Sequence, residues 1–506
     1  MATLTPSALM VALVQTASTA PSLLFGLIAG SLADIVDRRR VILITQVVLF
    51  ALTLLLGLAT LVGLIGPVSL LALTFLIGAG FTFYLPAQQA SVNDLVARAD
   101  LHPAVALGAI GFNLARAAGP ALAGAIAAGL GTGSAMVASA CFFLVMFVTL
   151  TRWEGPPSAI PGVRETLLGG VRSGLRYARH SALMRALLIH NLSFGLCASA
   201  LWALLPVIAR DQLALGAGGF GLLSGAFGTG AVIGAFTIPR QLQRFSLNSV
   251  VTAAVLLWVT AAALIAWTDL VALSLIGMMG AGAAWVGVFA SLSAGTQSAA
   301  PAWVRARAVA MSLVVVQGSL AFGSAMWGWL ASVSSIRVAL LASAGAMALL
   351  QLLNRRVSVR LGDEADVTPG AQLPDMGIAV TPRPDDGPVL IQIEYRIPPE
   401  NRQAFARAIH AVEPVRRRNG ADDWRAFRDV SEPDRFVERY IITSWAEYER
   451  LRNRMTIAES EFLDQVGELQ QSDVPVRVSR FIGLNPDEAG ELRGQIESDD
   501  AGDRRG

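Results

Sequence analysis

Long apolar stretches constrain this chain more than any other feature. Stretches of about twenty residues recur from Ala8 to about Leu353, and that length of α-helix crosses a hydrocarbon core about 30 Å thick. About eleven such stretches can be counted, and each is predicted to be a helix because backbone groups in lipid must be satisfied within the segment. Only 15% of the 506 residues are charged, against about 25% in soluble domains. The sequence therefore predicts an all-α polytopic protein of the lipid bilayer, with no nucleic-acid partner.

The arginines are distributed unevenly between alternate connectors. One set of connectors carries Arg38 to Arg40, Arg98, the arginines between Arg152 and Arg185, Arg240, Arg244, Arg305, Arg307 and Arg355 to Arg360. The other set offers only Arg210 and Arg337. Because short arginine-rich loops stay on the cytoplasmic side, we expect the first set and the C-terminal tail to be cytoplasmic. The expected location is the bacterial inner (plasma) membrane.

Residues 30–40 form a short charged connector between two of the apolar stretches, with the sequence Gly-Ser-Leu-Ala-Asp-Ile-Val-Asp-Arg-Arg-Arg. Its spacing resembles the loop signature of the major facilitator superfamily, Gly-x-Leu-Ala-Asp-(Arg)-x-Gly-Arg-Arg. The matching positions are Gly30, Leu32, Ala33, Asp34, Arg38 and Arg39. The chain departs from the signature at Ile35 and Asp37, where the superfamily often has a basic residue and a glycine. The Asp-Arg-Arg form resembles the exporter branch that includes the enterobactin exporter and the transmembrane secretion effectors.

This resemblance implies a twelve-helix transporter, and one apolar stretch fewer precedes the loop than in the superfamily. Residues 1–30 resemble the second helix of the superfamily, and they lack the basic region and cleavage site of a signal peptide. Two interpretations remain open, a start codon placed too late or a protein that lacks the first span. The first is favoured because that helix normally lines the substrate cavity.

An internal repeat divides the apolar region into two halves. Leu71-Ala-Leu-Thr with Gly78 and Gly80 recurs as Val271-Ala-Leu-Ser with Gly280 and Gly282, and Pro103-Ala-Val-Ala-Leu recurs as Arg307-Ala-Val-Ala-Met. Transporters built from two such halves bind substrate between them and rock around that site. We assign the halves to residues 1–151 and 186–360. Residues 152–185 form the cytoplasmic linker, in which 163–188 is predicted to be an amphipathic helix on the inner leaflet; a solvated linker is the alternative.

Polar residues within the apolar stretches are candidates for a substrate cavity. Arg116 lies about twelve residues into the stretch 104–130, where an unpartnered arginine costs at least about 3 kcal/mol. We expect Arg116 to face the cavity and bind an anionic group of the substrate, although an internal ion pair would also satisfy it. The other candidates are Asn113, one turn earlier, Gln317, at the equivalent place in the second half, and Gln88 and Gln89.

Gly119, Pro120 and Gly124 lie in the same stretch as Arg116. They resemble the superfamily's antiporter signature, Gly-Pro-x-x-Gly-Gly, with Ala123 in place of one glycine. Proline removes a helix hydrogen bond, and glycine lets a neighbouring helix approach closely. The resemblance implies export coupled to protons, whereas close packing without a role in coupling is equally compatible with these residues.

Asp34 and Arg38, with Gly30 and Arg39, are predicted to form a conformational latch. A carboxylate at a helix end, bridged to arginine, would hold one state of the transport cycle, and its protonation would loosen that state. A positive anchor that only sets topology is the alternative. His190 is interpreted as a packed or carbonyl-bonded histidine rather than a proton carrier.

The composition changes beyond Arg360. Residues 361–387 are predicted to be a flexible linker and 485–506 a disordered tail. Within 388–484, strands are expected at Val389–Arg396, Trp424–Val430, Arg435–Ser444 and Val476–Ile482, and helices at Glu400–Arg418 and Trp445–Leu469. This βαββαβ order predicts a ferredoxin-like domain. The domain resembles the dimeric α/β-barrel group that includes antibiotic-biosynthesis monooxygenases, which implies homodimerisation as one role.

No cluster of catalytic residues is visible in that domain, where His410 is alone and Trp424, Phe427, Tyr440 and Trp445 are interpreted as core and dimer-face aromatics. Cys141 and Cys197 suggest no metal site. We therefore expect no enzyme activity and no cofactor. The main hypothesis is a transporter that exports siderophore-like or drug-like small molecules by proton antiport. The alternatives are a non-transporting membrane anchor for an interaction or sensing domain, and a membrane-tethered enzyme.

Overall fold

The computed structural model describes the chain except residues 2–3, 6, 96–110, 112–114, 116–118, 120–121, 153–166, 216, 302, 369, 371–381, 472–473 and 484–506. The chain divides into two compact units. The first unit contains Met1–Val171, Leu183–Ser298 and Arg305–Leu361. The second contains Arg172–Ala182, Ala299–Val304 and Gly362–Gly506.

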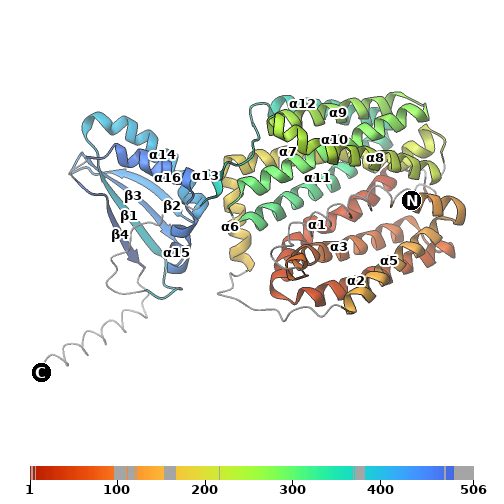
Figure 1. The fold of residues 1–506 in the computed structure, drawn as a ribbon, viewed down its shortest axis with the longest axis horizontal. Coiled ribbons are helices and arrows are strands. Elements are labelled where there is room, and N and C mark those ends of the chain that lie inside the picture. Colours follow the sequence, from red (N-terminus) through yellow and green to blue (C-terminus); the bar gives the residue numbers. More distant parts are fainter. Residues whose placement is uncertain are drawn as a thin grey trace, which may run out of the picture. The chain divides into compact units, whose positions relative to one another are not determined.

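The first unit is a bundle of long helices (Figure 1). Its helices are α1 (Ala8–Ile35), α2 (Arg38–Leu61), α3 (Pro67–Leu95), α5 (Thr132–Thr151), α7 (Ala182–Val207), α8 (Ala217–Arg244), α9 (Leu247–Trp267), α10 (Val271–Ala299), α11 (Arg305–Val333) and α12 (Ile336–Asn354). Among the described residues, 10 helices are long and apolar enough to cross a membrane. Much of the predicted span over 104–130 lies outside the described residues. The predicted polytopic helical architecture is confirmed.

Side chains on the outside of this bundle are apolar. Phe142 of α5 is 74% exposed and Trp267 at the end of α9 is 80% exposed, and α2 presents Ile44 and Leu55 in the same way. So much exposed apolar surface would cause a water-soluble protein to aggregate. In a membrane this apolar surface faces the lipid tails, as expected for a transmembrane bundle.

Glycine allows the closest helix contacts in the second half. A Cβ atom built on Gly230 of α8 would lie 1.8 Å from the Met279 carbonyl oxygen, and one on Gly282 of α10 would lie 1.9 Å from that of Phe227. The two backbones thus touch, as small residues permit between helices in lipid. Gly282 belongs to the internal repeat, so at least one repeated glycine has a packing role.

An aromatic cluster fills the interior of the second half. Neighbouring rings lie 4.5 to 6.2 Å apart between centroids, most of them in the edge-to-face arrangement that aromatic pairs favour and the others tilted. The cluster comprises Phe194, Trp202, Phe227, Trp258, Trp285 and Phe289, from helices α7 to α10. These rings join four helices into one packed body, a grouping that the sequence did not indicate.

The predicted linker between the halves contains helix α6 (Leu167–His180). The single amphipathic helix expected over 163–188 is interrupted, because Ser181 separates α6 from α7. Tyr177 and Ala178 near the end of α6 are buried, so this end of the linker packs against protein and is not freely solvated.

The C-terminal domain contains a four-stranded sheet in the order β2-β3-β1-β4, with every neighbouring pair antiparallel. Its strands are β1 (Val389–Arg396), β2 (Asp422–Arg428), β3 (Arg435–Ile442) and β4 (Arg477–Ile482). The helices are α14 (Arg402–Asn419), α15 (Trp445–Arg454) and α16 (Ile457–Glu468), preceded by the short α13 (Glu364–Val367). This is the predicted βαββαβ arrangement.

The predicted second helix of that domain is wrong in one respect, because it is two helices. Thr456 begins α16 as its N-cap, and the Glu459 carboxylate accepts a hydrogen bond from the Thr456 backbone N–H at 3.0 Å. This capping box ends the preceding helix at Arg454, since the backbone of Met455 and Thr456 is extended.

One face of the sheet is covered by helices and forms the domain core. Along β1, buried and half-buried residues alternate, as in a strand with one face inward. Helices α14 and α16 pack against each other, and Figure 1 shows them on one side of the sheet. Trp424, Tyr440 and Trp445 are buried in this core as predicted, whereas Phe427 is 42% exposed.

A buried carboxylate lies inside this core. The Glu438 side chain is 0% exposed and accepts hydrogen bonds from Arg416 Nε at 2.9 Å, Trp424 Nε1 at 2.8 Å and the Tyr395 hydroxyl at 3.0 Å. Burial, together with the neighbouring carboxylate, raises the pKa of Tyr395 well above its ordinary value, so the hydroxyl stays protonated and donates. The network gives the buried charge a cation and two further donors.

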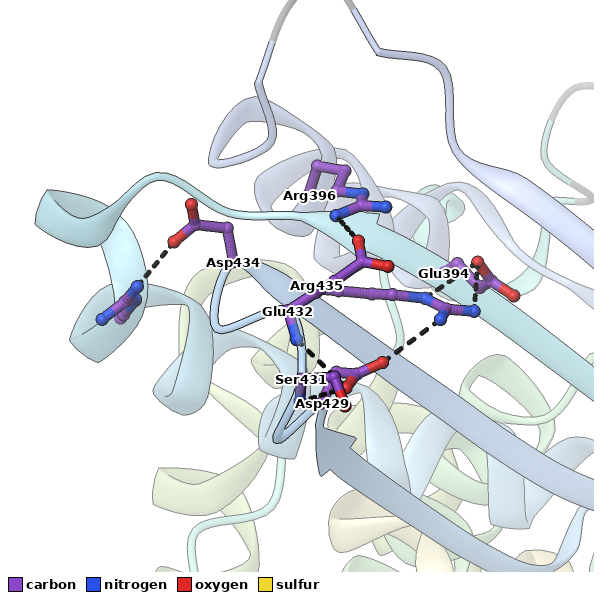
Figure 2. A network of polar contacts seen from close by, with 8 residues as sticks. Glu394, Arg396, Asp429, Ser431, Glu432, Asp434 and Arg435 are labelled. Carbon is purple, nitrogen blue, oxygen red and sulfur yellow. Dashed lines mark hydrogen bonds and ion pairs between the residues drawn. The ribbon is translucent and has the colours of Figure 1, made fainter.

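A second, partly exposed network closes the turn between β2 and β3 (Figure 2). Arg435 lies between Glu394 and Asp429, with nitrogen–oxygen distances of 2.9 and 3.2 Å. Asp429 also accepts hydrogen bonds from the backbone amides of Ser431 and Glu432, at 2.7 and 3.2 Å. These contacts fix the turn that sets the register of the hairpin.

The second network predicts that the domain loses stability in acid. The hydrogen bond from Arg435 lowers the pKa of Glu394, and the two backbone amides lower the pKa of Asp429. A depressed folded-state pKa stabilises the fold above the ordinary value of about 4, and this contribution is lost as the pH falls through the folded value. We expect amide exchange in β3, corrected for intrinsic rates, to show this loss between about pH 5 and 3. Glu394→Gln should flatten the profile, and an unchanged profile would contradict the assignment.

Candidate functional site

Helices α1 and α11 bring the two halves of the bundle together. The Thr16 hydroxyl of α1 donates to the Ala321 carbonyl of α11 at 2.8 Å. A Cβ atom built on Gly328 would lie 2.3 Å from Cβ of Ala12, and one on Gly318 would lie 2.9 Å from the Leu23 side chain. Since α1 lies in the predicted first half and α11 in the second, this contact is where the halves meet.

Helix α3 packs on another side of α1. Ser22 and Thr82 hydroxyls are 2.9 Å apart, and a Cβ atom on Gly78 would lie 2.5 Å from the Ser18 carbonyl oxygen. Gly78 is one of the repeated glycines, so the first half uses the same close helix contact as the second. Helix α1 is therefore held between α3 of its own half and α11 of the other.

The charged connector holds the ends of helices together. Asp37 is the N-cap of α2, and its carboxylate accepts a hydrogen bond from the Arg40 backbone amide at 3.1 Å. Arg39 donates to the last carbonyls of α5, Leu150 at 3.4 Å and Thr151 at 3.0 Å. Arginine there also complements the negative end of the α5 dipole. The capping role of Asp37 was not predicted, because three arginines separate this aspartate from the apolar stretch that it precedes.

The remaining latch residues are only partly described. Gly30 lies in α1, and no described atom comes within 4 Å of a Cβ built on it. Arg38 begins α2, and the side chain of Asp34 lies outside the described part. The structure thus places Arg39 between two helix ends and leaves the proposed role of Asp34 a prediction.

The predicted cavity residues are described in part. Gln88 on α3 and Gln317 on α11 are both half-buried, and Gln317 directly precedes Gly318, which contacts α1. Gln317 therefore lies close to the interface of the two halves. Asn113, Arg116 and the side chain of Gln89 lie outside the described residues, so the polar ring stays a prediction.

The antiporter-type motif is described at two positions. Gly119 is helical, and a Cβ atom there would meet no described atom within 4 Å. Gly124 is buried in the helix that ends at Leu130, and Pro120 lies outside the described residues. The bend expected at the proline stays a prediction.

His190 lies in the interior of the second half. It is 3% exposed, and its Nδ1 donates to the Ala186 carbonyl at 2.9 Å, which is the carbonyl-bonded arrangement expected from the sequence. Ser193, Gln351 and Asn354 line a small cavity beside it. Over the described part of the chain, no three His, Cys, Asp or Glu side chains are grouped as metal ligands would be.

Comparisons with known proteins agree with this architecture. Over 194 residues the chain is 28% identical to the multidrug efflux pump Tap of Mycolicibacterium fortuitum, covering 37% of this chain and 47% of the pump. The match thus spans about half the length of that relative.

Two solved transporters share the fold. A bacterial homologue of the human lysosomal transporter Spinster, in an inward-facing and unoccupied conformation, aligns with a TM-score of 0.54 at 14% identity, over 69% of this chain and 90% of that one. The nucleoside transporter NupG aligns with a TM-score of 0.54 at 15% identity, over 69% and 90%. Both likenesses concern the fold of the membrane region.

The sequence profile that describes transmembrane secretion effectors covers the bundle and the C-terminal domain together, matching residues 1–487. With the repeated halves, the α1–α11 contact and the transporter fold, this match identifies the chain as a multi-pass transporter of the major facilitator superfamily and a member of the transmembrane secretion effector family.

Proposed function

We propose that this protein exports small amphipathic molecules from the bacterial cytoplasm in exchange for protons. The observation that carries the proposal is the α1–α11 contact, in which two repeated halves meet through glycines and the hydrogen bond from Thr16 to Ala321. Transporters built from two repeated halves rock around the place where the halves meet. Similarity to a multidrug efflux pump supports the outward direction.

In this proposal the substrate binds between the halves near the bilayer midplane. Gln317 lies close to the interface, and Gln88, Gln89, Asn113 and Arg116 complete the polar lining. The Arg116 guanidinium would bind an anionic group of a siderophore-like or drug-like molecule, since an arginine at that depth needs such a partner. Gly119, Pro120 and Gly124 would form the bend that seals one side of the cavity.

The connector with Gly30, Asp34, Arg38 and Arg39 would act as the latch on the cytoplasmic side. Arg39 already bonds the end of α5, so a movement of α2 relative to α5 would break two hydrogen bonds. Protonation of Asp34 would weaken the remaining contacts and release the state. The positive-inside pattern supports a cytoplasmic location for this connector and the C-terminal domain.

The open face of the C-terminal sheet would pair two copies of the transporter. Leu390 lies between Ile441 and Phe481 in the register of the sheet, and Phe427 pairs with Val437. Phe427 and Phe481 are 42% and 50% exposed. Exposed aromatic rings on a sheet face are typical of a protein interface, which supports homodimerisation.

Transport into inverted membrane vesicles tests the proposed function. Vesicles containing the protein, with an acidified lumen, should accumulate the amphipathic anion carboxyfluorescein several-fold above vesicles without it. Accumulation should collapse when nigericin dissipates the pH difference. The amphipathic cation ethidium should accumulate less, because Arg116 would repel it. Equal accumulation with and without the protein for both dyes would count against export and favour the anchor.

A further inference from the structure

The second compact unit contains more than the C-terminal domain. It includes Arg172–Ala182 from the inter-half linker and Ala299–Val304, the connector between α10 and α11. Both segments continue directly into membrane helices, Ala182 into α7 and Val304 into α11. Three segments far apart in the sequence therefore form one packed body.

Five side chains hold these segments together, and we call them the docking cluster: Tyr177, Trp303, Arg418, Glu447 and Arg454. The guanidinium of Arg454 lies 4.2 Å from the centroid of the Trp303 ring, and that of Arg418 lies 5.8 Å from the Tyr177 ring. The two rings meet edge to face with centroids 6.0 Å apart. Cations over aromatic faces attract most strongly when shielded from water.

The docking cluster is shielded and electrostatically matched. Tyr177 is 2% exposed, and the Arg454 side chain is 6% exposed. Glu447 Oε1 lies 2.7 Å from Arg454 and 3.3 Å from Arg176 of α6, so one carboxylate joins the domain to the linker. The Tyr177 hydroxyl donates to the Ala299 carbonyl at 3.0 Å and joins the linker to the connector.

The docking cluster is linked to helix α11 by the polypeptide chain, because Trp303 belongs to the connector that leads into this helix. Trp303 precedes the first residue of α11 by two positions, and α11 is the helix that contacts α1 of the other half through Thr16 and Ala12. In the rocking cycle of the proposed function, on which this inference rests, α11 has to change its angle against α1.

We propose that the C-terminal domain restrains transport by holding the start of α11 through the docking cluster. While the cluster is intact, the conformation that contains it is stabilised, and leaving that conformation is slower. A partner or second copy that bound the domain and pulled it from Trp303 would then accelerate efflux. The domain is thus a brake on the transporter, and it acts without contacting substrate.

Two variants on opposite sides of the contact test this proposal in full-length protein. Arg454→Met removes the cation that lies over Trp303 and the ion pair with Glu447. Trp303→Leu removes the aromatic ring itself, and Trp303 belongs to the connector and not to the C-terminal domain. Arg407→Met is the matched control, because Arg407 is exposed on α14. Amide exchange is measured in nanodiscs, and carboxyfluorescein transport in inverted vesicles.

We expect both variants to raise exchange in 172–182 and 299–304 at least tenfold, with β1 and β3 unchanged, and to raise the initial transport rate several-fold. The control should change neither. Unchanged exchange in those segments would overturn the docking, and faster exchange with an unchanged or lower rate would overturn the restraint. A wild-type protein that moves no dye would refute the proposed function and the restraint together, while exchange would still decide the docking.

Discussion

Replacement of Arg416 by methionine is expected to lower the free energy of unfolding of the C-terminal domain by about 3–5 kcal/mol. The variant leaves the Glu438 carboxylate, which is 0% exposed, without its cation. Trp424 and Tyr395 still donate to it, but two neutral donors do not replace an ion pair in a dry core. The effect is large because Arg416 is the cation paired with a fully buried carboxylate.

Amide exchange in β1 and β3 of the full-length protein measures this effect. A loss of about 3–5 kcal/mol should accelerate exchange through domain opening by about two to three and a half orders of magnitude. The double variant Arg416→Met with Glu438→Gln should recover part of the loss, because the neutral amide oxygen can still accept from Trp424 while the amide NH2 donates to the Tyr395 hydroxyl oxygen. Arg435→Met removes an arginine from the second, partly exposed network and serves as the control with a smaller effect. If Arg416→Met and Arg435→Met accelerated exchange equally, burial of the Arg416–Glu438 ion pair would not increase its contribution to stability.

Arg116→Ala and Asp34→Asn are each expected to abolish transport while the protein still inserts into the membrane. The first variant removes the proposed partner of the anionic substrate group, and the second removes the proposed protonation site of the latch. Loss of an essential charged contact of about 3 kcal/mol corresponds to more than a hundredfold. Carboxyfluorescein accumulation in inverted vesicles, normalised to protein in the membrane, gives the readout.

Gln351→Ala is the matched control for these variants, since Gln351 is a polar residue of the bundle that bonds Thr252 at 2.9 Å and has no role in the proposed mechanism. Transport at wild-type rates in both Arg116→Ala and Asp34→Asn would remove these residues from the mechanism and leave the transporter fold untouched.

The fold was largely predictable because its periodicities are simple. Strand β1 has the predicted bounds, Val389–Arg396, since alternation of apolar and polar residues marks a strand with one buried face. The apolar stretches predicted the transmembrane helices because about twenty consecutive apolar residues are the length that crosses a bilayer as a helix. The break at Thr456 was missed because the capping box lies within a stretch of otherwise good helix formers.

Contacts between distant segments were not predictable in the same way. Glu438 occupies an inward position of β3 beside Tyr440, which is a signal for a buried charge, but nothing in the sequence names Arg416 as its partner. The bonds from Arg39 to α5 and from Tyr177 to Ala299 join residues more than a hundred positions apart. Such pairs depend on how helices pack, which local patterns do not specify.

Proton movement coupled to substrate movement tests the central claim most directly. The purified protein would be placed in liposomes with a pH-sensitive dye in the lumen, and carboxyfluorescein added outside, without any imposed gradient. Exchange of substrate for protons predicts that the lumen becomes more alkaline as carboxyfluorescein enters, and that the change disappears in Arg116→Ala. Entry of the anion with no change in luminal pH would contradict proton antiport, and no entry at all would contradict transport of this class of molecule.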